Sequence, residues 1–304
     1  MGGMYMGQHS ITVGDVEVTI TNAEKLLWKG ITKADYLNYL AKISPLMLPF
    51  LHNKPLTVIR YPDGIMGEAF YQRNCPEYAP DFIKTVEHHD NNYIICSDLP
   101  SLLWLGNQAA IEFHIPFSSY QSEKPSEIVF DLDPPSNEAF HLAVLAAEQI
   151  KDNLDRLHLT GFLKLSGNKG LQIHIPLPFD TFTYEQTKVF TAFMAKFLVE
   201  TNPNLFTIER LKKNRNERLY IDYVQHASGK TIIAPYSPRG NAEGLVAAPI
   251  EWNELKDELT PTDFSMERVL KRKLTPFHDY EKARDQQPFK EILDWLLTKK
   301  TNHL

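Results

Sequence analysis

The chain has little cysteine. Its 304 residues include only Cys75 and Cys96, too few for a disulfide framework, and the two are not spaced as zinc ligands. The sequence therefore excludes a small disulfide-stapled protein, and we expect a reducing compartment.

Long apolar runs are absent as well. No stretch reaches the roughly 20 apolar residues of a membrane-spanning helix. Residues 1–10 are rich in Gly and Met and lack the basic segment and apolar core of a secretory signal. We therefore expect a soluble, cytoplasmic protein with no membrane partner.

An excess of positive charge is the third absence. Lys and Arg number 32 against 38 Asp and Glu, for a formal net charge of −6. General coating of nucleic acid is therefore excluded, and any polyanion must bind locally. The obvious patch is ERLKKNRNER at 209–218, with five basic and two acidic residues, although such a run is usually a solvated face. A smaller basic patch occupies 271–273.

Two carboxylates end an apolar segment at residues 127–135, which reads EIVFDLDPP. The apolar residues suit a buried strand, and the two prolines end it. Because side chains alternate along a strand, Asp131 and Asp133 project to the same side, roughly 7 Å apart at their Cα atoms. Carboxylates that converge there repel each other unless a proton or cation is present, and Mg²⁺ or Mn²⁺ prefers such oxygen ligands. The pattern indicates a metal clamp, or else a strand end whose acids face water.

A short glycine-containing connection lies in LKLSGNKGLQIHIP, residues 163–176. Glycines let backbone N–H groups approach a phosphate, to which Ser166 adds a hydroxyl and Lys169 a charge. The segment is no Walker loop, because GKS or GKT is absent and a strand follows. It indicates a phosphate-binding loop or an ordinary hairpin. Gln172 and His174 leave the second strand on one face.

A third acid interrupts an apolar run in RLYIDYVQHASGKTIIAPYSPR, residues 218–239. Burial of Asp222 without a partner is costly, so it faces water or completes a charged site. We expect a strand, a turn and a strand here, with Lys230 and Arg239 on the same hairpin. Three acids, a glycine loop with a lysine, and a guanidinium suit phosphoryl or nucleotidyl transfer, in which metal ions bridge acids and phosphates.

The segments DLDPP, SGNKGL and IDYVQHASGKTIIAPYSPR together resemble the polymerase domain of bacterial DNA ligase D. That domain is a member of the archaeo-eukaryotic primase superfamily and acts in non-homologous end joining. The resemblance covers the chain from about Val16 onward. It implies an α/β (α+β) fold with a primase-like catalytic core, whose acids lie on a central, mostly antiparallel sheet flanked by helices. It also implies template-directed filling of gaps and extension of 3′ ends at DNA breaks, with a preference for ribonucleotides.

Site residues follow from the resemblance. Asp131, Asp133 and Asp222 are implied to bind two catalytic ions, Mn²⁺ or Mg²⁺. The nucleotide-binding candidates are His114, Ser166, Lys169, Gln172, Gln225, Lys230 and Arg239. The DNA-binding candidates are Asn22, Lys25 and Lys33 for a downstream 5′-phosphate, Phe70 and Tyr71 for stacking on a template base, and Arg215 in a loop that moves near the active site. Without the family, the two lysines Lys25 and Lys33 would be solvated residues around helix starts, and the two aromatics would be core.

One position departs from the family pattern. The family motif reads SGxKGLH, where x is any residue. This chain reads SGNKGLQ at residues 166–172, so Gln172 stands in place of the histidine. Glutamine can donate to a phosphate oxygen but cannot become cationic. His174 lies on the same face, displaced along the strand by about 7 Å. The matching register favours Gln172 for the phosphate contact.

Periodicity predicts interleaved helices and strands. We expect helices at 33–48, 101–110, 137–157, 184–200 and 289–299, and strands near 11–20, 56–60, 126–132, 162–165, 171–176, 218–223 and 231–234. Residues 260–276 are expected to be a wrapping segment. We expect one domain over 1–304, with a DNA-end-binding part over about 16–96 and a catalytic core with its C-terminal segment over about 97–304.

The implied partners are DNA with gaps, overhangs or double-strand break ends, and NTP or dNTP. A DNA ligase domain and Ku are further candidates, and the implied location is the bacterial nucleoid. Two alternatives stay open: a metal-dependent nuclease or phosphohydrolase that uses the same acids, and a non-catalytic DNA-end binding module. Extension, shortening or no change of a labelled primer separates these alternatives.

Overall fold

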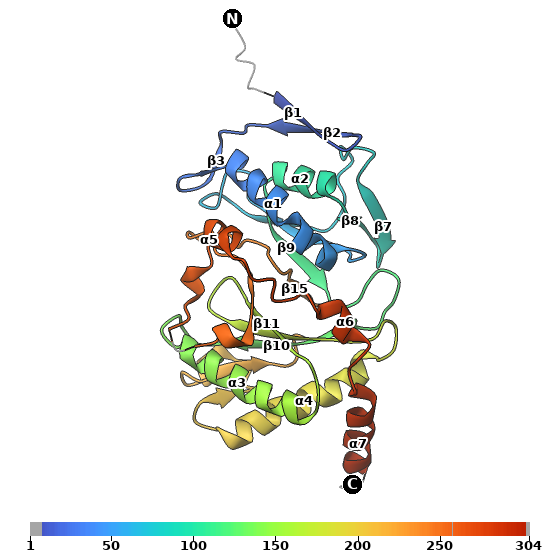
Figure 1. Ribbon diagram of the computed structural model, residues 1–304, viewed down its shortest axis with the longest axis vertical. Coiled ribbons are helices and arrows are strands. Elements are labelled where there is room, and N and C mark those ends of the chain that lie inside the picture. The colour runs from blue at the N-terminus through green and yellow to red at the C-terminus, as the bar shows by residue number, and fades with distance from the viewer. Residues whose placement is uncertain (1–7, 257, 302–304) are drawn as a thin grey trace, which may run out of the picture. The chain divides into compact units, whose positions relative to one another are not determined.

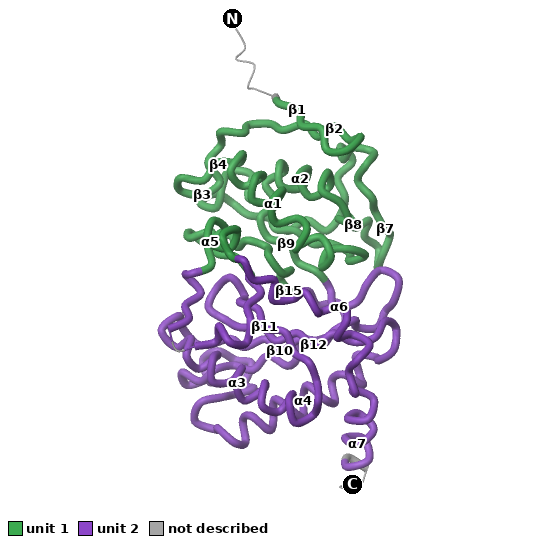
Figure 2. The backbone as a smooth tube through the Cα atoms, viewed as in Figure 1, with its two compact units in different colours: residues 1–115, 232–247, 264–272 green, residues 116–231, 248–263, 273–304 purple. Residues whose placement is uncertain are grey.

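The structure, a computed structural model, describes residues 8–256 and 258–301. The chain divides into two compact units, shown in Figure 2. The first comprises residues 1–115, 232–247 and 264–272, and the second comprises 116–231, 248–263 and 273–304. The first unit thus extends past the expected boundary near residue 96 and includes two later segments. A single functional domain over 1–304 stays a prediction.

The first unit contains a four-stranded sheet in the order β15-β9-β5-β6. These strands span, in that order, Thr231–Ile233, Ala110–Pro116, Thr57–Arg60 and Phe70–Gln72. The unit also contains helices α1 (Lys33–Leu51), α2 (Leu99–Asn107) and α5 (Met266–Lys271) (Figure 1). Three hairpins complete it: β1 (Gln8–Val13) with β2 (Val16–Thr21), β3 (Leu26–Trp28) with β4 (Ile31–Thr32), and β7 (Lys84–His88) with β8 (Asn91–Ile95).

Helix α1 begins at a capping box and is fixed to the sheet by two tyrosines. The Thr32 side chain accepts the Asp35 N–H, and the Asp35 carboxylate accepts the Thr32 N–H. Tyr36 and Tyr39 are fully buried on the inner face of the helix. Their hydroxyls donate to backbone carbonyls of β9 and of the segment after β15. These bonds hold α1 against the strands that carry the polar residues of this unit.

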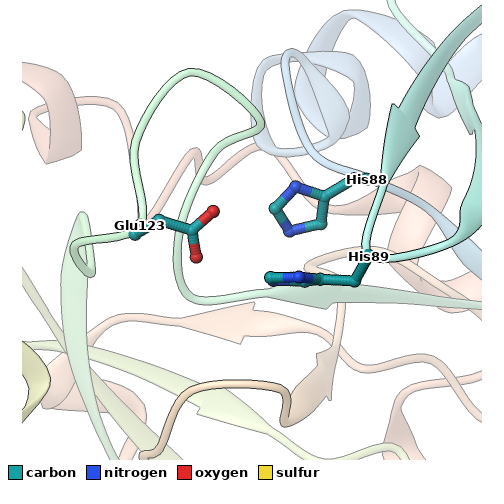
Figure 3. Close-up of side chains that lie close together, drawn as sticks. All are labelled: His88, His89 and Glu123. Atoms are coloured by element: carbon teal, nitrogen blue, oxygen red, sulfur yellow. The ribbon is translucent and has the colours of Figure 1, made fainter.

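The β7–β8 hairpin places two histidine rings side by side at its tip. The ring centroids of His88 and His89 lie 4.0 Å apart, with the planes inclined at 56° (Figure 3). His89 and the following Asp90 have positive φ angles of 45° and 61°. This left-handed backbone forms the tight turn that the sequence did not mark with a glycine.

The second unit contains a six-stranded sheet in the order β13-β14-β10-β12-β11-β16. Its strands span, in that order, Phe206–Thr207, Leu219–Asp222, Glu127–Asp133, Leu171–Pro176, Phe162–Leu165 and Pro249–Ile250. Neighbouring strands are antiparallel except for the parallel pair β13–β14. The helices are α3 (Phe140–Arg156), α4 (Tyr184–Thr201), α6 (Tyr280–Arg284) and α7 (Phe289–Thr301), with short 3-10 turns at Lys212–Asn214, Trp252–Glu254 and Pro261–Asp263.

The two faces of the six-stranded sheet differ in chemistry. Phe130 of β10 packs against Phe190 of α4, with ring centroids 6.1 Å apart. Asp131 and Asp133 have the opposite parity on the strand, so they project from the other face. Glu127 has the same parity as the two acids and accepts a hydrogen bond from a tyrosine of α6. The sheet therefore presents its carboxylates on the face opposite α4.

The fold class expected from the sequence is confirmed, because helices flank mostly antiparallel sheets. Four element predictions are wrong in part. Residues 11–20 form not one strand but a hairpin that turns at Gly14, which has a φ of 60°. Strands β14 and β15 belong to different sheets, so 218–239 is not one hairpin.

The other two errors concern ends and connections. Helix α2 stops at Asn107, because Ala109 turns the backbone with a φ of 57° and Ala110 begins β9. The wrapping segment 260–276 contains helix α5, which Ser265 caps by accepting the Arg268 N–H. Within the described part of the chain, no helix has the length and apolar character needed to span a membrane.

Candidate active site

Asp131 and Asp222 lie directly opposite each other on neighbouring strands. They are Cα partners in the antiparallel β10–β14 pair, and Asp133 follows on the same face, opposite Tyr220. Directly opposed residues place their Cβ atoms about 4.5 to 5.5 Å apart. Strand pairing therefore brings the third acid beside the first two, although it lies far away in the sequence.

The environment of the acids favours a cation. Burial raises the pKa of Asp131 to about 6; a hydrogen bond from Gln172 opposes this, whereas the charges of Asp222 and Asp133 add to it. Burial also raises the pKa of Asp222, although its Oδ1 accepts hydrogen bonds from the Tyr220 hydroxyl at 3.1 Å and the Gln225 amide at 3.0 Å. A bound cation offsets the free-energy cost of burying such carboxylates in their charged form, and it also offsets their mutual repulsion.

Asp133 is bound by two positive side chains. Lys169 Nζ lies 3.2 Å from Oδ1, and Arg215 Nη1 lies 3.1 Å from Oδ2. Lys169 also donates to two proline carbonyls just beyond β10, at 2.6 and 3.2 Å. The Arg215 guanidinium lies over the Tyr220 ring, 3.9 Å from its centroid. The structure therefore brings the expected lysine of the glycine loop and the expected arginine of the basic patch to the acids.

The connection between β11 and β12 has the form of a hairpin loop. The Ser166 Oγ accepts the N–H groups of Asn168 at 3.2 Å and Gly170 at 3.0 Å, which closes the loop. Gly167 has a φ of 74°, a conformation that favours glycine. A Cβ on Gly170 would lie 2.5 Å from the Leu132 carbonyl oxygen. The loop thus packs closely against the strand that carries the acids.

Gln225 and Lys230 occupy the segment after β14. The backbone N–H of Gln225 donates a hydrogen bond to Asp222, and its side-chain Nε2 donates to the Thr231 carbonyl at 2.7 Å. Lys230 is exposed. The structure therefore places Gln225 beside the acids and leaves Lys230 at the surface.

Gln172 is buried and hydrogen-bonded at both ends of its amide. Lys164 Nζ donates to Oε1, and Nε2 donates to Asp131 Oδ1 at 3.1 Å. His174 lies on the same face but instead bonds the buried Glu127 through Nδ1, at 2.8 Å. Sequence reasoning missed Lys164. Its signal is a lysine between two leucines in an otherwise apolar strand.

In the first unit, Glu112 on β9 contacts two of the nucleotide-binding candidates, His114 and Arg239. Its Oε2 lies 2.9 Å from His114 Nε2 and 3.2 Å from Arg239 Nη1, and its Oε1 accepts the Gly240 N–H at 2.9 Å. Burial acts to raise the pKa of Glu112, but His114, Arg239 and the Gly240 amide together lower it. Sequence reasoning missed Glu112 too, although its alternation with His114 on one strand was a signal.

The lysines expected at a 5′-phosphate differ in exposure. Lys33 is buried at the start of α1, where its Nζ donates to two backbone carbonyls at 2.7 and 3.0 Å. Burial, together with the charges of Lys25 and Arg60, lowers the pKa of Lys33 to about 8. Lys25 pairs with Asp63 at 2.9 Å, and Asn22 has a φ of 52°. Lys33 is therefore not a solvated residue, and it belongs to a group of cations.

The aromatic pair Phe70 and Tyr71 is exposed on β6. The two residues are 43% and 72% exposed, so the alternative that they are core is wrong. Being adjacent on a strand, they project to opposite faces. The Arg60 guanidinium lies 5.1 Å from the centroid of Phe70. Both rings offer a face on which a base can stack.

The acids suit a hard divalent cation. Asp131 and Asp222 offer oxygen ligands from two adjacent strands, and Mg²⁺ and Mn²⁺ prefer such ligands. Asp133 can join them once its ion pairs with Lys169 and Arg215 are exchanged for a metal ion. The donor set present on this sheet face therefore fits the metal chemistry expected from the sequence.

Comparison with known proteins identifies the family of the chain. The profile of the family described as "LigD, primase-polymerase domain" matches residues 32–278. The chain is 46% identical over 288 residues to the Bifunctional non-homologous end joining protein LigD of Bacillus subtilis, covering 93% of the chain and 47% of that protein. It is 34% identical over 263 residues to the Multifunctional non-homologous end joining DNA repair protein LigD of Mycobacterium tuberculosis, covering 81% of the chain and 34% of that protein.

A solved structure also matches the chain. The polymerase domain from Mycobacterium tuberculosis Ligase D in complex with DNA matches with a TM-score of 0.78 and 31% identity, over 88% of this chain and 96% of that one. The chain spans less than half the length of the two full-length relatives. With the profile match over most of its length, the chain belongs to the LigD primase-polymerase domain family.

Proposed function

We propose that this chain is a template-directed nucleotidyltransferase that fills gaps and extends 3′ ends at DNA breaks in non-homologous end joining. The observation that carries the proposal is the pairing of Asp131 with Asp222 on one sheet face, with Lys169 ion-paired to Asp133 beside them. Membership of the primase-polymerase family supports it. Carboxylates for metal ions beside a lysine for phosphate are what nucleotidyl transfer requires.

Asp131, Asp133 and Asp222 are the proposed ligands of two divalent ions, Mg²⁺ or Mn²⁺. Such ions, when bound, lower the pKa of a primer 3′-hydroxyl and neutralise phosphate charge. Lys169 and Arg215, which bind Asp133 in this structure, are then available to phosphate oxygens. The ion pairs on Asp133 thus hold two phosphate-binding groups close to where they are needed.

The other nucleotide contacts are proposed within each unit taken by itself. In the second unit they are Ser166, Gln225 and the exposed Lys230. In the first unit, Glu112 fixes the orientation of His114 and Arg239, and so prepares a guanidinium for bidentate binding of phosphate. Holding these side chains in place before the nucleotide binds reduces the entropy that binding costs.

The DNA contacts are also proposals. Lys25, Lys33 and Asn22 would bind the 5′-phosphate on the downstream side of a gap, and Phe70 or Tyr71 would stack on a template base. A preference for ribonucleotides, an attached DNA ligase domain and association with Ku belong to the same proposal. The names of the full-length LigD relatives support the end-joining role.

Primer extension tests the function. A labelled primer on a gapped duplex with a downstream 5′-phosphate is incubated with each NTP or dNTP, in Mg²⁺ or Mn²⁺. We expect extension by the templated nucleotide, and a loss of at least about 10²-fold in rate for Asp131→Asn and Asp222→Asn. Asp155→Asn is the matched control, because Asp155 is an exposed acid of α3 paired with Lys151, and it should extend normally. Primer shortening would favour a nuclease, and normal extension by Asp131→Asn would remove the proposed metal site.

A further inference from the structure

Four residues form one row across four strands of the second unit. Lys164 on β11 is the Cα partner of Gln172 on β12, Gln172 is the partner of Asp131 on β10, and Asp131 is the partner of Asp222 on β14. Because directly paired residues share a face, the four side chains stand side by side. Lys164 is 0% exposed and Gln172 is 3% exposed. The row therefore leads from a buried positive charge to the carboxylates of the candidate metal site.

The hydrogen bonds along the row have one possible direction. A lysine ammonium can only donate, so the end of Gln172 that faces Lys164 must be its carbonyl oxygen. A carboxylate can only accept, so the end that faces Asp131 must be the amide NH₂, which lies 3.1 Å from Oδ1. The two ends of the glutamine thus fix its orientation independently and consistently. The positive charge of Lys164 polarises the Gln172 amide, and the polarised NH₂ group donates to one oxygen of Asp131.

We propose that Lys164 and Gln172 are positioning residues that hold Asp131 ready to bind a divalent metal ion, and that Gln172 does not contact the triphosphate. This inference rests on the proposed function of the acids as metal ligands. With Oδ1 fixed by Gln172, the carboxylate rotamer is set before the metal binds. Outer residues that orient a metal ligand in this way typically matter 10- to 100-fold for metal affinity or activity.

The same chemistry accounts for glutamine at a position where the family has histidine. A neutral imidazole offers one N–H donor and one nitrogen acceptor, as the glutamine amide does. Either side chain can therefore accept from Lys164 and donate to Asp131. A phosphate contact would instead require Gln172 to give up a bond to the buried Lys164 or to the half-buried Asp131, which is costly. In this chain, Gln172 therefore makes a connection within the protein and not a contact with the nucleotide.

Two measurements test the proposal: Mn²⁺ binding to the protein without nucleotide or DNA, and steady-state primer extension. The variants are Gln172→Met, which has neither donor nor acceptor, Gln172→Glu, which has no donor for Asp131, and Gln172→His. We expect Met and Glu to weaken Mn²⁺ binding and lower kcat by about 10- to 100-fold, with the KM for nucleotide changed by less than about threefold. Gln172→His should keep Mn²⁺ binding within about threefold of the unaltered protein.

Lys164→Met tests the far end of the row. It should weaken Mn²⁺ binding like Gln172→Met, and the double variant should be no worse than either single one, because both break the same connection. Lys54→Met, which removes a buried lysine from the first unit, is the control and should leave Mn²⁺ binding unchanged. If Lys164→Met does not fold, as judged by its thermal unfolding, the contrast between Gln172→Glu and Gln172→His decides the matter.

Two results would overturn the inference. One is Gln172→Met with unchanged Mn²⁺ affinity and a raised KM for nucleotide, which would make Gln172 a triphosphate contact. The other is Lys164→Met with unchanged Mn²⁺ affinity. Failure of the proposed function is distinguishable from both, because a protein that binds Mn²⁺ through this row but never extends a primer would refute polymerisation and leave the positioning intact.

Discussion

Asp133 binds Lys169 and Arg215 at the place where a metal ligand is proposed, so these cations compete with a metal ion. We therefore expect opposite effects of Lys169→Ala on two ligands. Mn²⁺ should bind more tightly without nucleotide, because a competing charge has left Asp133. The KM for nucleotide should rise at least about tenfold, because a charged hydrogen bond to phosphate contributes about 1.5 to 3 kcal/mol.

Mn²⁺ titration and steady-state kinetics on the same preparation check this prediction. Lys188→Ala, at an exposed position of α4, is the control and should change neither quantity. Weaker Mn²⁺ binding in Lys169→Ala would show that the lysine supports the carboxylates and does not compete for them.

We expect the buried histidine His226 to make stability depend on pH. It is 2% exposed, and its Nε2 lies 2.9 Å from the Thr187 hydroxyl. Burial lowers its pKa from 6.5 to about 4, although the charge of Glu127 opposes the shift. Between these values the unfolded chain binds more protons than the folded one, so the free energy of unfolding rises with pH from about 4 to 6.5 and is lost as pH falls.

Urea unfolding at pH 4.5, 5.5, 6.5 and 7.5 measures the effect. The slope from this group is at most about 1.4 kcal/mol per pH unit, so the loss on acidification should reach roughly 2 to 3 kcal/mol. His226→Gln keeps a polar partner for Thr187 but does not titrate. Subtracting its curve from that of the unaltered protein should isolate the slope, whereas two parallel curves would show that His226 is not responsible.

At the scale of elements, a buried polar cluster joins helix α6 to the sheet, beside the ring contact between Tyr280 and Phe162 of β11. The Tyr280 hydroxyl of α6 and Nδ1 of His174 both bond Oε2 of Glu127. Tyr280→Phe removes a donor from a buried carboxylate, which should cost about 1 to 3 kcal/mol of unfolding free energy. Hydrogen exchange of the α6 amides should accelerate with it. Tyr120→Phe, at an exposed tyrosine, should stay within about 0.5 kcal/mol, and an equal loss in both variants would contradict the role of the cluster.

Local patterns made much of the second unit predictable. Alternation placed Asp131 and Asp133 on one face, and the glycine loop lay between two recognisable strands, β11 and β12. These features depend on neighbours in the sequence. Gly14 was also a local turn signal inside an alternating run, and the hairpin of β1 and β2 could have been predicted from it.

Long-range pairing is where prediction from sequence stopped. Nothing local shows that Asp222 pairs with Asp131, or that β15 leaves its neighbour β14 for a different sheet. Glu112 was missed for the same reason, whereas Lys164 was missed although its partner Gln172 lies in the same β11–β12 hairpin. A buried charge is recognisable as part of a site only when its partner is known, and Arg239, the partner of Glu112, comes from a distant segment of the chain.

At the scale of the whole molecule, a net charge of −6 opposes binding to DNA. Affinity must therefore come from a few local contacts. Their number can be estimated from the salt dependence of binding, because each phosphate contact contributes about −0.9 to the slope of log K against log salt concentration. Lys212 and Lys213 are exposed in the short 3-10 turn of the basic patch 209–218, which also contains Arg215. They are candidates for two such contacts.

The double variant Lys212→Ala and Lys213→Ala should therefore reduce the steepness of the slope by about 2 units and weaken binding to gapped DNA roughly equally for all sequences. Fluorescence anisotropy with a labelled gapped duplex at several salt concentrations measures both quantities. The control is Lys188→Ala with Lys290→Ala, which removes two exposed lysines from helices α4 and α7 and changes the net charge equally. If the slope falls only in the first variant, DNA contacts the basic patch. Equal changes in both would mean that overall charge governs binding, and the patch would be an ordinary solvated surface.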